Sequence, residues 1–160
     1  MRWELIDRFD VLLKGNRALA WKAYTGQEDF FTEHEPGHPV VPETLLIEMI
    51  AQAGGVLFGL GLDFKKEVIL AKIENARFIR ETAPPCRFRV EAKIEESREE
   101  GAWISGEVSS QDGLCASAKI MLVTIDKLVE EPGRKIVFND RFLSHYDIWN
   151  VAQQSEKVRA

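Results

Sequence analysis

The fold of this chain is decided by residues 42–62, PETLLIEMIAQAGGVLFGLGL, a long and almost wholly apolar stretch. Proline is tolerated at a helix start, and Glu43 places a carboxylate near the positive end of the helix dipole. We therefore expect a helix from Glu43 to Leu60, about 27 Å long at a rise of 1.5 Å per residue. Because the helix is apolar on nearly every face, it must be buried on every side, at the centre of the fold.

The segments on both sides of this helix alternate apolar and polar residues, as half-buried strands do. Strands are expected at 4–14 and 17–25, joined by a turn at Gly15-Asn16, and then at 68–73, 76–79, 87–97, 102–110 and 114–125. Gln111-Asp112-Gly113 predicts a hairpin between the last two strands. Two strands, one buried helix and a meander predict an α+β domain over residues 1–126, with a curved antiparallel sheet wrapped around the helix.

Residues 127–160 differ in composition and form an expected C-terminal extension. Pro132-Gly133 marks a break, and Asn139-Asp140 predicts the cap of a last helix. That helix would carry an aromatic and polar stripe formed by Phe142, Tyr146, Trp149 and Gln153. We expect the stripe to pack on the domain or on a partner chain rather than to bind a ligand.

The composition is that of one soluble globular domain: 160 residues, 45% hydrophobic and 29% charged. A net charge of −5 argues against general nucleic-acid binding. No membrane span is expected, because Glu48, Gln52 and four glycines interrupt the apolar stretch. No secretory signal is expected either, because Met1-Arg2-Trp3-Glu4 is not a basic start followed by an apolar run. Cys86 and Cys115 lack metal-site spacing and are expected to be small strand residues in a reducing cytoplasm.

Polar residues interrupt the apolar helix at regular positions. Thr44, Glu48 and Gln52 stand at i, i+4 and i+8, so they share one narrow stripe of the helix surface. A carboxylate on an apolar helix is costly to bury unless it is paired. One interpretation is that Glu48 is hydrogen-bonded in a polar core network or lies at the surface. The other is that Glu48 takes part in acid/base chemistry.

The loop at 26–42 supplies a partner for such chemistry. Prolines and glycines prescribe its path, and a loop this long inside a compact domain is more often functional than not. It carries His34, whose side chain can exchange a proton near neutral pH, so His34 and Glu48 form a candidate acid/base pair. His34 to His38 also matches the zinc-protease pattern HExxH, but that pattern needs a helix, which Pro36 and Gly37 oppose. No metal site is therefore expected.

Residues 30–52, FFTEHEPGHPVVPETLLIEMIAQ, resemble the signature FFxGHFPGxPxxPGxLxxExxAQ of the FabZ-type 3-hydroxyacyl-(acyl-carrier-protein) dehydratases. The spacing of fourteen residues between histidine and glutamate is the same. Residues 75–80 and Pro85 are also similar to that family, so the resemblance covers about residues 4–125. It implies a hotdog fold and a homodimer, or a trimer of dimers. The catalytic site would lie at the dimer interface, with histidine from one subunit and the acidic residue from the other.

The resemblance also implies a role for each site residue. His34 would remove the proton next to the thioester carbonyl, and Glu48 would donate a proton to the departing 3-hydroxyl group. The backbone at the start of the helix, with Gly37, Glu43 and Thr44, would polarise the thioester oxygen. The site would be lined by Phe31, Pro42 and Gln52. No cofactor is expected.

The implied partner is an acyl carrier protein, or another acyl thioester. Acyl carrier proteins are acidic, so a local basic patch would suit docking despite the net negative charge of the chain. The candidates are Lys72, Arg77 and Arg80, with Arg87 and Arg89 nearby in the sequence. The alternative for each of them is a solvated strand face.

Three positions depart from the family signature. Glu33 and Glu43 stand where the family has glycine, and Glu35 stands where it has phenylalanine. These residues bring negative charge close to the expected site, and Glu43 loses the backbone freedom of glycine. Two other functions therefore stay open beside the dehydratase: a hotdog acyl thioesterase, and a non-catalytic protein that binds acyl thioesters.

Overall fold

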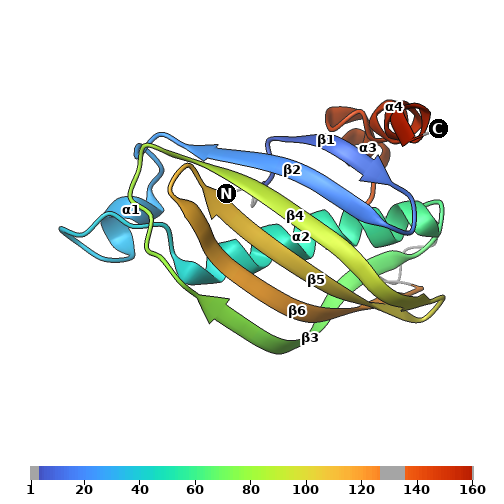
Figure 1. The fold of residues 1–160 in the computed structure, drawn as a ribbon, viewed down its shortest axis with the longest axis horizontal. Coiled ribbons are helices and arrows are strands. Elements are labelled where there is room, and N and C mark those ends of the chain that lie inside the picture. Colours follow the sequence, from blue (N-terminus) through green and yellow to red (C-terminus); the bar gives the residue numbers. More distant parts are fainter. Residues whose placement is uncertain (1–3, 127–135, 160) are drawn as a thin grey trace.

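The computed structural model describes residues 4–126 and 136–159, and it shows a six-stranded antiparallel sheet curved around one long helix (Figure 1). The strands are β1 (Arg8–Leu13), β2 (Arg17–Tyr24), β3 (Glu67–Phe78), β4 (Cys86–Arg98), β5 (Gly101–Ser110) and β6 (Gly113–Ile125), in the order β1-β2-β4-β5-β6-β3. The helices are α1 (Phe30–Glu33), α2 (Glu43–Gly61), α3 (Asp140–His145) and α4 (Ile148–Arg159). The predicted α+β architecture is confirmed.

Helix α2 lies against the concave face of the sheet and contacts five of its strands, β2 to β6. Small residues on that face let the helix approach closely, and Gly106 of β5 lies directly opposite Ile50. From Leu45 to Leu60 every residue of α2 is buried except Glu48 and Gln52. The helix is long and apolar enough to cross a membrane, but most of its length is buried inside the domain. It is therefore the core helix of this fold.

The two edge strands of the sheet, β1 and β3, differ in what covers them. Helix α4 packs along β1, where the backbone N–H of Leu12 donates to Ser155 Oγ at 3.0 Å and that hydroxyl donates to the carbonyl of Val151 at 2.8 Å. The opposite edge strand, β3, pairs with β6 on one side only within residues 4–126 and 136–159. One edge is thus covered by the chain itself, and the other presents backbone groups that no other described strand pairs with.

The structure differs from the sequence-based expectation in four elements. Strand β1 begins at Arg8 rather than at residue 4, because the backbone N–H of Leu5 donates to Gln52 Oε1 instead of to a neighbouring strand. Strand β3 is continuous, because two bulges, between Leu70 and Lys72 and between Ile73 and Asn75, interrupt the alternation without ending the strand. The loop at 26–42 contains the short helix α1. The last helix is divided into α3 and α4 near Asp147, which has a positive φ of 48°. The break predicted at Pro132-Gly133, like residues 1–3, lies outside the described residues.

Replacing Gly106 with alanine tests the close approach of sheet and helix. A Cβ atom at Gly106 would overlap Ile50 Cγ2, whereas a Cβ atom at Gly61 would meet nothing within 4 Å. Gly106→Ala should therefore lower the free energy of unfolding by about 1–3 kcal/mol. Gly61→Ala should leave it unchanged or raise it by up to about 1 kcal/mol. Urea titration of both variants measures the difference, and equal stabilities would contradict this packing.

Candidate active site

The two polar residues within the buried part of α2 are joined to each other. Gln52 Nε2 donates to Glu48 Oε1 at 3.0 Å, and Gln52 Oε1 accepts from the backbone N–H of Leu5 at 3.1 Å. Because Leu5 N–H needs the amide oxygen, the amide NH₂ group must face the carboxyl group. Gln52 therefore holds Glu48 in one orientation, and no other hydrogen bond to the Glu48 side chain occurs within the described part of the chain.

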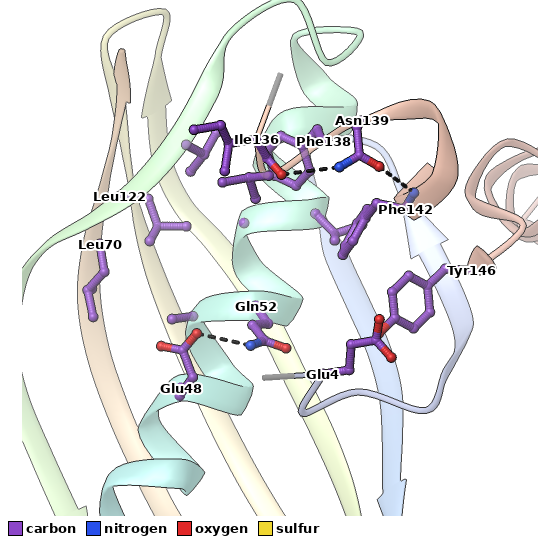
Figure 2. Close-up of a pocket in the computed structure, with 15 residues that line it drawn as sticks. Glu4, Glu48, Gln52, Leu70, Leu122, Ile136, Phe138, Asn139, Phe142 and Tyr146 are labelled. Carbon is purple, nitrogen blue, oxygen red and sulfur yellow. Dashed lines mark hydrogen bonds between the residues drawn. The ribbon is translucent and has the colours of Figure 1, made fainter. Parts of the chain in front are cut away.

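Glu48 and Gln52 face a cavity of about 330 Å³, shown in Figure 2. Helix α2 forms one wall, and strands β3 and β6 contribute Val68, Leu70 and Leu122. The remaining lining comes from Glu4 and from residues 136–146, which we call the C-terminal segment. Its contributions are Ile136, Val137, Phe138, Asn139, Phe142 and Tyr146. The cavity is mostly apolar, and Gln52 orients the Glu48 carboxyl group at its wall. Such a cavity is suited to an apolar ligand that carries a reactive polar group.

His34 lies at the end of α1, where its backbone N–H donates to the carbonyl of Phe30 at 2.9 Å. Phe31 anchors this short helix, because its buried ring contacts Tyr24 at a centroid distance of 5.8 Å. The His34 side chain is exposed. No hydrogen bond or ion pair joins it to Glu48 within one chain. The single chain therefore does not bring the two predicted catalytic residues into contact.

The remaining residues predicted for the thioester-binding end lie around the start of α2. Pro42 is the buried residue before the helix, and Glu43 and Thr44 are exposed in its first turn, where backbone N–H groups have no partner within the helix. Gly37 lies in the exposed loop with a positive φ of 85°, a conformation that favours glycine. Next to it, His38 Nε2 lies 3.3 Å from Glu81 Oε2.

The three basic residues predicted to dock a carrier are all exposed on or just after β3. None of them forms a salt bridge with another described residue. Arg77 is the next-to-last residue of β3, and Arg80 immediately precedes Glu81, which contacts His38, so both lie towards the His34 loop. Lys72 lies nearer the start of β3 and farther from the His34 loop, with its Nζ 5.9 Å from the ring centre of Trp103.

Two contributions to the site were not predicted from the sequence. Phe142 and Tyr146, two members of the aromatic stripe, line the cavity, a role that was not predicted. Glu67 is a buried carboxylate that binds backbone amides of the C-terminal segment. The spacing of aromatic residues in the sequence was a signal for the contribution of Phe142 and Tyr146. The contribution of Glu67 had none, because its partners are main-chain groups.

The two cysteines behave as structural residues. Cys115 is buried in β6, and Cys86 is half-buried at the start of β4. Burial raises the pKa of the Cys86 thiol to about 11. The thiolate is the nucleophilic form, so this cysteine is a poor nucleophile at neutral pH.

A curved antiparallel sheet around a buried helix is the hotdog fold, and solved structures agree with it. The chain superposes on an uncharacterized protein from Pyrococcus horikoshii with a TM-score of 0.60 and 15% identity, covering 77% of this chain and 85% of that one. A Thermus thermophilus member of the thioesterase superfamily gives a TM-score of 0.58 at 21% identity, covering 71% and 84%. At such identities the likeness shows the fold alone.

Sequence comparison identifies the family. Residues 2–119 match the FabA-like domain. The chain is 35% identical to the FabZ 3-hydroxyacyl-[acyl-carrier-protein] dehydratase of Coxiella burnetii over 74% of this chain and 87% of that protein. The corresponding Syntrophotalea carbinolica dehydratase is 33% identical over 74% and 82%. The Clostridium acetobutylicum dehydratase is 40% identical over 92 residues, which is 64% of its length. The chain belongs to the FabA-like family, among the FabZ-type dehydratases.

Gln52→Ala tests the network that orients Glu48. The substitution leaves the buried N–H of Leu5 without its acceptor, so it should lower the free energy of unfolding by about 1–3 kcal/mol. Gln153 is exposed on α4, and Gln153→Ala should change stability by no more than about 0.5 kcal/mol. Urea unfolding of both variants measures the difference. Matching stabilities would show that Gln52 does not hold this network together.

Proposed function

We propose that the protein removes water from a 3-hydroxyacyl-(acyl-carrier-protein) thioester to give the trans-2-enoyl thioester, in fatty-acid or related lipid or polyketide synthesis. The observation that carries this proposal is the oriented Glu48 carboxyl group at the wall of an apolar cavity, in a chain of the FabZ type. The cavity would take the acyl chain, and the exposed start of α2 would receive the thioester.

The reaction needs one base and one acid on opposite parts of the substrate. His34 would accept the proton from C2, and the electrons of that C–H bond would form the double bond between C2 and C3. As the C3–O bond breaks, Glu48 would give its proton to the leaving hydroxyl group, which departs as water. The proton held by His34 then returns to Glu48 through solvent, so the enzyme is restored. Backbone N–H groups in the first turn of α2 would stabilise the negative charge on the thioester oxygen.

The two catalytic groups would come from different subunits of a homodimer. Strand β3 is long, its outer edge is unpaired among the described residues, and it exposes apolar side chains beside that edge. Leu70, Ile73, Phe78 and Ile79 expose 37%, 47%, 40% and 51% of their surface. Such an edge promotes pairing with another chain, and a second copy would cover it symmetrically. The dimer would place His34 of one subunit near Glu48 of the other.

The carrier protein would dock near the His34 loop, in the cytoplasm. Arg80 lies beside this loop, which contacts the following residues through the Glu81–His38 pair and through Val41 N–H donating to the Thr82 carbonyl at 2.9 Å. Arg77, the next-to-last residue of β3, adds a second positive charge near the end of that strand. An acidic carrier placed there would deliver its thioester to the start of α2.

Single substitutions test the chemistry. His34→Ala and Glu48→Gln should each lower kcat by about 100- to 10,000-fold, because each removes one proton-transfer group. The reverse reaction, hydration of an enoyl-carrier thioester, is measured as the loss of absorbance of the enoyl thioester. A wild-type protein without activity, or variants as fast as the wild type, would overturn the proposal. Release of free thiol from the acyl thioester would identify a thioesterase instead.

Mixing the two inactive variants tests the shared site. If each site takes His34 from one subunit and Glu48 from the other, a mixed dimer holds one intact site. Random pairing of co-expressed His34→Ala and Glu48→Gln chains should then restore about a quarter of the wild-type activity. If both groups come from one chain, no mixed dimer has an intact site, and the mixture should stay as inactive as its components.

A further inference from the structure

The C-terminal segment is fixed to the sheet by a buried carboxylate. Glu67, the first residue of β3, exposes only 3% of its surface. Its carboxylate accepts hydrogen bonds from the backbone N–H groups of Ile136, Val137 and Phe138. Burying a carboxylate is costly unless donors replace its water, and these three amides supply them. The start of the segment is therefore held in one place beside the cavity.

Aromatic rings continue from this anchor along α2. Phe138 is buried against the helix where side chains are missing: a Cβ atom at Gly59 would lie 3.0 Å from its ring, and one at Gly55 would lie 3.9 Å away. Phe142 contacts the Phe138 ring at 5.8 Å and the Tyr146 ring at 4.9 Å. The Tyr146 hydroxyl donates to the carbonyl of Ile6 at 2.8 Å, which fixes the other end of the row.

We propose that this row of rings is the end wall of the acyl-chain site and limits the length of the acyl chain that the enzyme accepts. The inference rests on the proposed function. In Figure 2 the cavity extends from Glu48 and Gln52 towards Phe138 and Phe142. From Glu48 to Gly55 the helix rises only about 10 Å. A cavity of about 330 Å³ is at the small end for ligand sites. The preferred substrates are therefore short and medium acyl chains.

The direction in which the acyl chain would lie follows from the arrangement of the helices. Helix α2 begins beside α1, which carries His34 at its end, and runs towards the end of the molecule where α3 and α4 lie (Figure 1). A thioester at the start of α2 would thus point its acyl tail at the C-terminal segment. The proton-transfer groups and the chain-length wall would lie at opposite ends of one site.

Phe142→Ala removes part of the wall, and Leu143→Ala is its matched control. Phe142 is half-buried and lines the cavity, whereas Leu143 is its half-buried neighbour in α3 and lies outside the cavity. Hydration rates would be measured with carrier-bound enoyl chains from crotonyl to hexadecenoyl. Phe142→Ala should raise the ratio of kcat/KM for long over short chains by about 10-fold or more. Leu143→Ala should keep the wild-type profile.

Glu67→Gln tests the anchor of the C-terminal segment without changing a side chain that lines the cavity. Val68, the neighbour of Glu67, lines the cavity, but Glu67 itself does not. Glu67 would therefore act on the acyl chain only by positioning the C-terminal segment. The variant should broaden the chain-length profile in the same direction as Phe142→Ala. Glu74 lies exposed on the same strand and pairs with Lys119 at 3.0 Å, and Glu74→Gln should leave the profile unchanged. This pair keeps the proposal testable if Phe142→Ala does not fold.

Binding of free fatty acids tests the proposed end wall independently of the proposed reaction. The shift in melting temperature caused by fatty acids of increasing length would be measured for the same variants, because this readout needs no turnover. If the wild type is inactive but Phe142→Ala binds longer chains, the wall stands and the proposed reaction fails. If the wild type is active but neither chain-length profile moves in Phe142→Ala or Glu67→Gln, the reaction stands and the wall is wrong.

Discussion

An apolar helix without a polar face must be covered along its whole length, and the rest of this structure follows from covering α2. The concave sheet covers one side, and small residues such as Gly106 bring it close. The C-terminal segment covers part of the other side, where Gly59 leaves room for Phe138. Between Leu45 and Leu60 only Glu48 and Gln52 are incompletely buried, and both line the cavity. The candidate site is thus where the buried part of the helix carries its two polar side chains.

In the proposed reaction, this arrangement would let a single helix serve three parts of the chemistry. Its first turn offers backbone N–H groups to an oxygen, Glu48 lies about one and a half turns farther on, and the apolar cavity follows. The acidic residues that depart from the family signature, Glu33, Glu35 and Glu43, are all exposed. Solvent and salt screen exposed charges, so these carboxylates act weakly on a thioester held against the helix.

Much of this architecture was predictable, because α2 and strands β4, β5 and β6 carry strong local patterns that fix them to within one or two residues. The continuity of β3 was not, because its bulges interrupt the alternation. Glu67 could not be predicted, since its partners are main-chain amides about seventy residues away. The role of Phe142 depends on where its segment packs. The pairing of His34 with Glu48 is still a prediction, because it depends on a second subunit.

The central claim is that Glu48 acts on a 3-hydroxyacyl chain that lies along α2 and ends at the C-terminal segment. A crystal structure with a 3-hydroxyacyl pantetheine analogue, in which an amide replaces the thioester, tests it most directly. The expected complex has the 3-hydroxyl group within hydrogen-bonding distance of Glu48, C2 facing His34 of the partner subunit, and the end of the chain against Phe142. An acyl chain bound outside this cavity, or a 3-hydroxyl group out of reach of Glu48, would contradict the claim.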